Sequence, residues 1–132
     1  MPAIKYVEES QAAGAAKEAY AQIKGQFRVS KIPNTFKVMA NKPEFLKALL
    51  AMDDAVFKDD KLDSKTKHLI AVAVSAASGC QYCLHAHSAI AQLLGATNEE
   101  VAEAVTVAAV MGAYNNVNKA MGMQNDIVPK KR

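Results

Sequence analysis

The chain has 132 residues, enough for one domain, of which 51% are hydrophobic and 22% are charged. This balance excludes intrinsic disorder, and the longest mostly apolar stretch, Leu69–Ala77, is too short to cross a membrane, which takes about 20 residues. The net charge of +3 comes from scattered side chains, so we expect no nucleic-acid partner, and without a signal-peptide pattern we expect a cytoplasmic protein.

Strand signals are nearly absent, whereas helix signals recur along the first half of the chain. The first predicted helix spans residues 10–27, with Ser10 as a possible N-cap. After a proline break, a short helix is expected over residues 34–40. Pro43 suits the first turn of a third helix, which ends near Lys58.

The second half of the chain continues the helical pattern. One helix is predicted from Cys80 to Leu94, ending at Gly95, which suits a helix C-terminus. Residues 97–100 then form a capping box, because a threonine is followed three residues later by a glutamate. This box opens a last helix, which runs to between Tyr114 and Met123.

A helix predicted over residues 65–78 differs from the others because it carries apolar residues all round. It begins after the capping pair Asp63–Ser64, and we expect it to be buried on most sides. Residues 1–132 are thus predicted to form a single all-α domain, a bundle of about six helices. So small a bundle has a limited interior. We therefore expect a symmetric homo-oligomer to cover the remaining apolar surface.

The only two cysteines form the motif Cys80-Gln81-Tyr82-Cys83 at the start of a predicted helix. Three interpretations are open: two buried small residues without chemistry, half of a zinc site, or a redox dithiol. At a spacing of three, both sulfurs lie on one face of the helix, where unbonded backbone N–H groups favour a thiolate and lower the cysteine pKa. The position suits a nucleophile and is not needed for packing.

The three histidines differ in their surroundings. His87 lies one turn beyond Cys83 on an apolar stripe that is expected to face the interior, where it can take the thiol proton. By itself it would be interpreted as a core histidine, but the nearby motif favours a functional role. His85 projects from another face and is interpreted as surface or interface. His68, in the apolar helix, is either a satisfied core residue, a second member of a proton relay, or a metal ligand.

The segment from Leu62 to Gly112 resembles the carboxymuconolactone decarboxylase superfamily, specifically the branch similar to alkyl hydroperoxidase D. The resemblance rests on three matching stretches, which are Lys67-His68-Leu69-Ile70-Ala71-Val72-Ala73-Val74-Ser75, Gly79-Cys80-Gln81-Tyr82-Cys83 with His87, and Leu94-Gly95-Ala96-Thr97. Weaker matches at Pro33-Asn34-Thr35-Phe36 and Lys42-Pro43-Glu44-Phe45-Leu46 extend it to a core of about residues 32–123.

This resemblance implies an all-helical protein that assembles as a homo-trimer or homo-hexamer and acts as a thiol-dependent peroxidase or disulfide oxidoreductase without a cofactor. In that scheme a hydroperoxide converts Cys83 to a sulfenic acid, Cys80 resolves it to a disulfide, and His87 relays the proton. The disulfide is then reduced by an external dithiol reductant, either a thioredoxin-like or a lipoyl protein.

One position departs from the pattern of the family. Its relay begins with a glutamate twelve residues before the first cysteine, and this position is His68 here. With an ordinary pKa near 6.5, His68 can still act as a base, but we expect activity to fall at mildly acidic pH. The alternatives are a zinc site made of Cys80, Cys83, His87 and His68, and a non-catalytic oligomeric scaffold. Decarboxylation is not expected, because that branch generally lacks the CxxC motif.

Overall fold

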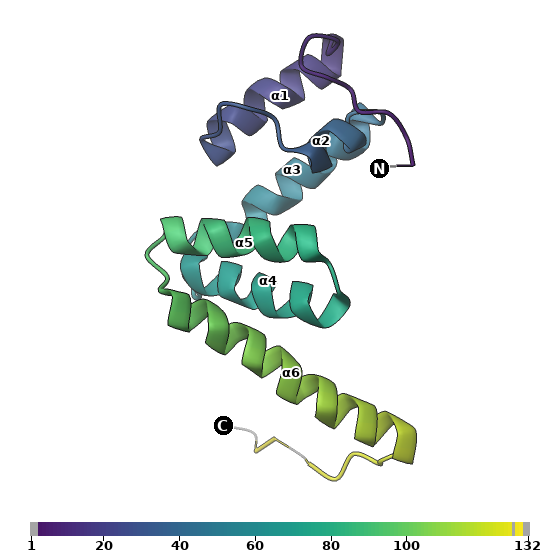
Figure 1. Ribbon diagram of the computed structural model, residues 1–132, viewed down its shortest axis with the longest axis vertical. Coiled ribbons are helices and arrows are strands. Elements are labelled where there is room, and N and C mark those ends of the chain that lie inside the picture. The colour runs from purple at the N-terminus through teal and green to yellow at the C-terminus, as the bar shows by residue number, and fades with distance from the viewer. Residues whose placement is uncertain (1–2, 128, 131–132) are drawn as a thin grey trace. The chain divides into compact units, whose positions relative to one another are not determined.

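The computed structural model describes residues 3–127 and 129–130, which contain helices and no strands, so the all-α prediction is confirmed. Six α-helices follow one another in the order α1 (Gly14–Phe27), α2 (Asn34–Met39), α3 (Pro43–Phe57), α4 (Ser64–Ser78), α5 (Gln81–Leu93) and α6 (Asn98–Met121) (Figure 1). Their contacts form two compact units, Met1–Lys58 and Asp59–Arg132. This division is finer than the single domain expected over residues 1–132, which stays a prediction.

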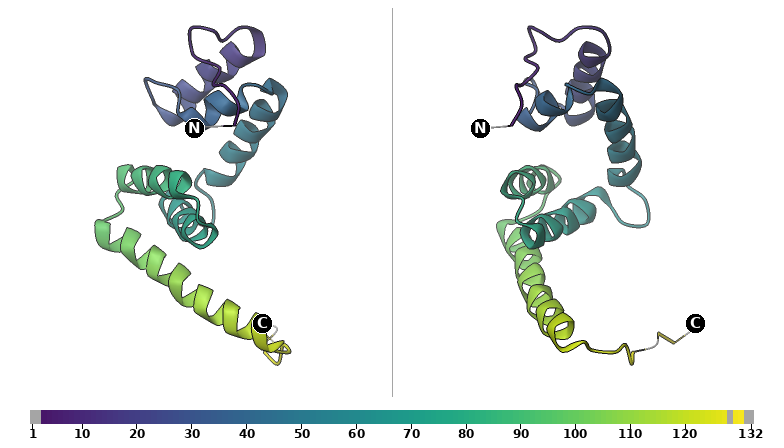
Figure 2. Two further views of the ribbon diagram at one scale, coloured as in Figure 1. Left: turned by 45° about the vertical axis from the view of Figure 1, so that its right-hand side comes forward. Right: turned by 90° about the vertical axis from the view of Figure 1, so that its right-hand side faces the viewer.

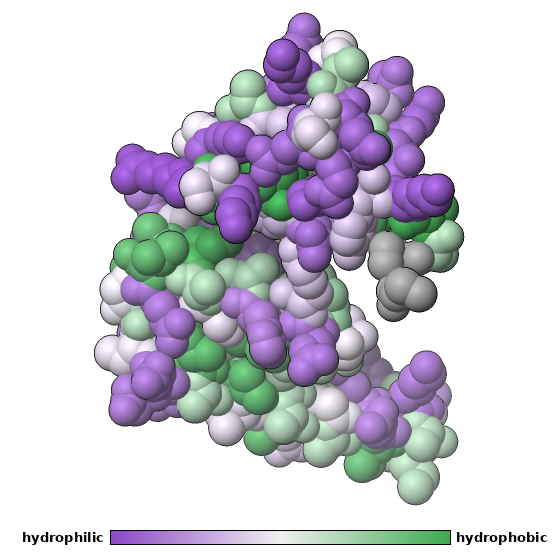
Figure 3. Space-filling model, turned by 45° about the horizontal axis from the view of Figure 1, so that its top comes forward, coloured by the Kyte–Doolittle hydropathy of each residue, from purple (hydrophilic) through white to green (hydrophobic). Residues whose placement is uncertain are grey.

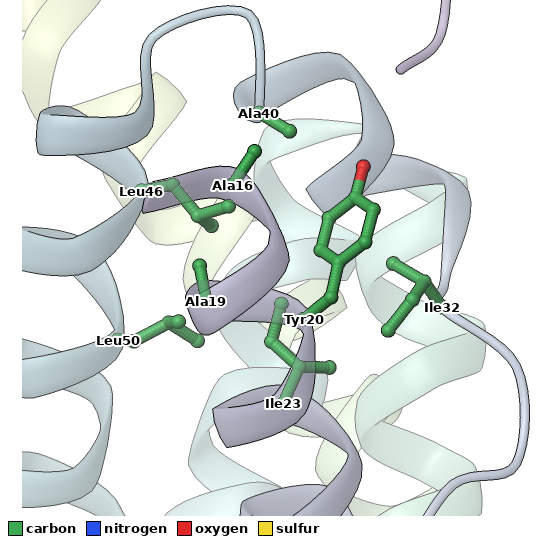
Figure 4. Packing of buried hydrophobic residues seen from close by; sticks show 8 residues of the cluster. All are labelled: Ala16, Ala19, Tyr20, Ile23, Ile32, Ala40, Leu46 and Leu50. Atoms are coloured by element: carbon green, nitrogen blue, oxygen red, sulfur yellow. The ribbon is translucent and has the colours of Figure 1, made fainter. Parts of the chain in front are cut away.

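The first unit holds α1, α2 and α3 around a small core. Ile23 of α1 and Leu46 and Leu50 of α3 have no exposed surface. Ala16 and Ala19 face the same core, where their small side chains leave room for the leucines of α3 (Figure 4). Tyr20 is buried in the same core, so small alanines and one large ring together fill this unit.

Helix α1 begins later than its sequence indicates. Ser10 was the expected N-cap, but the cap residue is Ala13, and it makes no side-chain cap. The reason is a turn closed by the Glu8 carbonyl, which accepts hydrogen bonds from the backbone N–H groups of Gln11 and Ala12. Gly14 then takes a left-handed φ of +52°, which interrupts a right-handed helix. A helix that began at Ser10 could therefore not continue past this residue.

The second unit holds α4, α5 and α6, with α4 packed against both of the others. His68, Val72 and Ser75 are buried and lie on one face of α4 at spacings of four and three. Lys65 of α4 also forms a 2.9 Å ion pair with Glu100 of α6. As Figures 1 and 2 show, α6 continues past α4, so that its far end lies away from both other helices.

The expectation that α4 is buried on most sides is wrong for the single chain. Ile70 and Val74 are 48% and 61% exposed, because α5 and α6 cover only part of the helix. Hydrophobic residues accordingly lie at the surface of the second unit, the lower part of Figure 3. No helix in the described part of the chain is long and apolar enough to cross a membrane.

Candidate active site

The first component of the candidate site is a disulfide at the start of α5. Cys80 and Cys83 are bonded to each other, with their Cα atoms 5.4 Å apart, a usual disulfide separation. The N-cap of α5 is Cys80 itself, and its sulfur accepts a 3.2 Å hydrogen bond from the backbone N–H of Cys83. Both cysteines are half-buried, and their bond to each other favours a redox dithiol over inert packing residues.

A tight connection between α4 and α5 sets the position of the disulfide. Gly79 ends α4 in the left-handed region at φ +73°, which glycine adopts without steric cost. The backbone N–H of Cys80 then donates a 3.0 Å hydrogen bond back to the carbonyl of Ser75. One glycine therefore reverses the chain and leaves Cys80 directly at the N-terminus of the next helix.

The second component is a pair of histidines that joins α4 to α5. The Nδ1 atoms of His68 and His87 lie 2.9 Å apart, within hydrogen-bond distance. One ring must donate its Nδ1–H while the other accepts on its lone pair, so the two rings hold different tautomers. His68 is only 6% exposed and His87 is half-buried. Helix spacing also places His87 one turn from Cys83, so the pair lies next to the disulfide.

Burial keeps both histidines neutral at pH 7. Loss of hydration lowers the pKa of His68 from 6.5 to about 4, with a smaller contribution from the nearby charge of His87. Burial also lowers the pKa of His87. Both shifts follow from the cost of charging an imidazole that has lost hydration. A neutral imidazole is the form that can accept a proton from a thiol.

The structure brings together all four residues that the sequence singled out, two in the disulfide and two in the histidine pair. The apolar stripe of α5 is confirmed at Leu84 and Ala91, which are half-buried and buried, but not at its end, because Leu94 is 46% exposed. His85 is exposed, as expected.

Sequence reasoning missed the hollow beside the motif. An open depression of about 660 Å³ lies along α5 and is lined by Gln81, Tyr82, His85 and Ala86. The signal that could have found it is Tyr82, an aromatic residue between the two cysteines that lies off the apolar stripe of the helix. Tyr82 is 49% exposed.

The zinc interpretation requires four side chains directed at one ion. Instead, Cys80 is bonded to Cys83, and Nδ1 of His68 meets Nδ1 of His87. Across residues 3–127 and 129–130, no group of three or more His, Cys, Asp or Glu side chains is arranged to hold a metal ion. The arrangement therefore favours the redox interpretation over the zinc site.

Comparison with known proteins tests the resemblance. The model of the carboxymuconolactone decarboxylase family matches residues 43–126, well over half of the chain. The chain belongs to the carboxymuconolactone decarboxylase family. This match covers α3 to α6 and therefore the whole candidate site, and it confirms the membership predicted from the motifs.

Two solved structures and one curated relative are similar to this family member. The alkylhydroperoxidase AhpD core of Rhodospirillum rubrum superposes with a TM-score of 0.88 at 26% identity, covering 96% of this chain and 95% of that one. A protein from Methanobacterium thermoautotrophicum gives a TM-score of 0.61 at 33% identity, over 67% and 99% of the two chains. Uncharacterized protein 4 in the cox locus of Paracoccus denitrificans is 45% identical over 83 residues, 61% of this chain and 75% of that protein.

Proposed function

We propose that this protein is a thiol-dependent peroxidase that reduces hydroperoxides with Cys83 and Cys80. The observation that carries the proposal is the Cys80–Cys83 disulfide at the N-terminus of α5, in the same unit as the hydrogen-bonded pair His68–His87. A disulfide at this position is the oxidised end-state of such a cycle. Similarity to the AhpD core of Rhodospirillum rubrum, a protein described as an alkylhydroperoxidase, supports the same activity.

The first step oxidises Cys83. Its thiolate attacks one oxygen of the hydroperoxide, so that the O–O bond breaks and an S–O bond forms. The sulfur becomes a sulfenic acid, and the departing alkoxide takes one proton to become an alcohol or water. The partial positive charge at the N-terminus of α5 favours the thiolate that this step needs.

The histidine pair supplies and holds the proton. Nδ1 of His87 is bonded to His68, so Nε2 of His87 is the atom that would take the thiol proton of Cys83. The Nδ1 hydrogen bond then spreads the positive charge toward His68. When the alkoxide leaves, the same proton passes to it, and the pair returns to two neutral rings.

The second step closes the disulfide. The Cys80 sulfur attacks the Cys83 sulfur and the S–O bond breaks. The leaving hydroxide takes the proton of the Cys80 thiol and departs as water. The N–H of Cys83 already donates to the Cys80 sulfur and would stabilise the attacking thiolate in the reduced protein. An external dithiol reductant, thioredoxin-like or lipoyl, then returns two electrons by thiol–disulfide exchange.

The proposal is tested by titrating the reduced protein with one equivalent of peroxide and counting thiols. We expect both thiols to be lost with one disulfide formed, while the exposed-site variant His85→Ala behaves like the wild type. Cys80→Ser should stop at a trappable sulfenic acid on Cys83, and Cys83→Ser should react far more slowly. Retention of both thiols under peroxide, or one bound zinc per chain in the same sample, would overturn the proposal.

A further inference from the structure

Reduction of the Cys80–Cys83 disulfide needs an outside thiol, and the attack of that thiol can begin at either sulfur. The attacking thiolate bonds to one sulfur and displaces the other, so the two choices give different mixed disulfides. The faster choice depends on the access to each sulfur and on how well the displaced thiolate is stabilised. The two cysteines of this chain differ in both respects.

The first difference is what lies beside each cysteine on α5. Cys80 precedes His87 by seven residues, about two turns, and His87 contacts His68 of α4. Cys80 is therefore on the side of α5 that faces α4. At about 100° per residue, Cys83 lies about 60° away from that side, in the direction of Ala86. Ala86 lines the open hollow on α5, so Cys83 is the cysteine that borders the hollow.

The residues of the hollow leave room for a thiol to approach Cys83. Tyr82 and Ala86 both line it, one directly before Cys83 and the other one turn beyond. Because Ala86 has only a methyl side chain, α5 presents little bulk between the hollow and the Cys83 sulfur. The exposed ring of Tyr82 offers an apolar surface to the carbon chain that carries an incoming thiol.

The second difference is the stability of the thiolate that each sulfur would become. Cys80 is the N-cap residue of α5, and its sulfur accepts a 3.2 Å hydrogen bond from the backbone N–H of Cys83. This donor is in place before the disulfide breaks, and the partial positive charge of the helix N-terminus acts on the same atom. A stabilised thiolate is displaced faster, so Cys80 is the better leaving group.

We propose that the external thiol enters through the hollow, attacks the Cys83 sulfur and displaces Cys80, with Tyr82 and Ala86 as positioning residues along the approach. This inference rests on the proposed function, in which the disulfide is reduced once in each cycle. A bond forms between the reductant sulfur and Cys83, and the electron pair of the broken disulfide leaves with the Cys80 sulfur. The second thiol of the reductant then attacks the first and releases Cys83. The reductant becomes a disulfide, and its two protons end on Cys80 and Cys83.

Trapping the mixed disulfide of the wild-type protein tests the choice of sulfur. The oxidised chain is mixed with the monothiol 2-mercaptoethanol, and free thiols are blocked early in the reaction with N-ethylmaleimide. Chymotrypsin cleaves after tyrosine, so cleavage at Tyr82 separates the two cysteines for mass spectrometry. We expect mercaptoethanol on Cys83 and maleimide on Cys80, in roughly tenfold excess over the reverse pair. An equal mixture, or an excess of the reverse pair, would overturn the proposal.

Filling the hollow tests the route. Ala86→Leu adds bulk between the hollow and Cys83, and we expect the second-order rate of disulfide reduction by 2-mercaptoethanol to fall roughly tenfold. The matched control Ala89→Leu adds the same side chain at an exposed position of α5 outside the hollow and should keep the wild-type rate. Circular dichroism checks that both variants keep their helix content. Equal rates in the three proteins would overturn the route through the hollow.

Both experiments are independent of the peroxide reaction. They start from the oxidised chain and use no peroxide, so their failure would leave the peroxidase proposal standing. A protein that does not react with peroxide would in turn give the same trapped products. The trapping experiment uses the wild type and decides the choice of sulfur even if Ala86→Leu does not fold.

Discussion

Nδ1 of His68 and Nδ1 of His87 face each other at 2.9 Å, and this contact joins α4 to α5 beside the disulfide. The bond forms with two neutral rings or with one extra proton, since one ring always donates and the other accepts. A second extra proton would set two N–H groups against each other. The pair therefore holds one proton at a time, which is the number that oxidation of Cys83 exchanges.

Replacement of His68 should change the rate of Cys83 oxidation. His68→Ala removes the partner of His87 Nδ1, and we expect a loss of roughly 10²-fold in the second-order rate with peroxide near pH 7. His68→Glu should raise the rate above that of the wild type, because a carboxylate accepts the Nδ1–H of His87 and stabilises its protonated form. Stopped-flow oxidation of the reduced proteins measures this, with His85→Ala as a histidine control. Equal rates in all four proteins would show that His68 only packs.

The pH profile of the same reaction should differ from that of an ordinary histidine. Burial lowers the pKa of both rings, to about 4 for His68. Both rings therefore stay neutral below their ordinary pKa of 6.5, and the rate should begin to fall only at a pH below that value. The rate of Cys83 oxidation should therefore fall at a lower pH than the mildly acidic pH expected from the sequence. A midpoint at or above pH 6.5 in the peroxide rate would contradict the buried pair.

Local sequence signals predicted the helix ends where a side chain alone decides them. Asp63 accepts a 2.7 Å hydrogen bond from the backbone N–H of Thr66, and the box of Thr97 and Glu100 is formed in both directions. The start of α1 failed because the competing partner of its backbone, the Glu8 carbonyl, is not readable as a cap signal. Capping is thus predictable from sequence when a side chain supplies the acceptor, and not when a backbone carbonyl does.

The members of the candidate site were predictable from the sequence, and the exact geometry of their contacts was not. The spacing of Cys80, Cys83 and His87 places them on one helix face, which periodicity reports directly. The role expected for His68 in a proton relay is matched by its contact with His87. Which ring atoms meet depends on the angle between α4 and α5 across Gly79, and no pattern within one helix contains that angle. The exposure of Ile70 was missed for a related reason, since periodicity does not say how many helices cover an apolar face.

Folding stability should also depend on the titration of His68. Its pKa is about 4 in the folded chain and near 6.5 when unfolded, so the unfolded chain binds more protons in this range. Stability from this residue is therefore complete above pH 6.5 and is lost as pH falls toward 4, by roughly 3 kcal/mol at most. Urea unfolding of the oxidised protein at several pH values measures the loss. His68→Gln, which cannot titrate, should flatten the curve; an equally steep curve would assign the effect to other groups.

The outer face of α4 gives the last prediction. Ile70 and Val74 remain largely exposed in the single chain, on a helix whose other side is the core of its unit. Half-exposed apolar side chains of this size gain about 1 kcal/mol each when a subunit covers them. We expect a closed homo-oligomer, a trimer or hexamer, with a mass at least three times 14.1 kDa by light scattering. Ile70→Glu/Val74→Glu should lower that mass, while Asn115→Glu/Asn116→Glu should not. A wild-type protein that runs as a single 14.1 kDa species at micromolar concentration would show that this face needs no subunit to cover it.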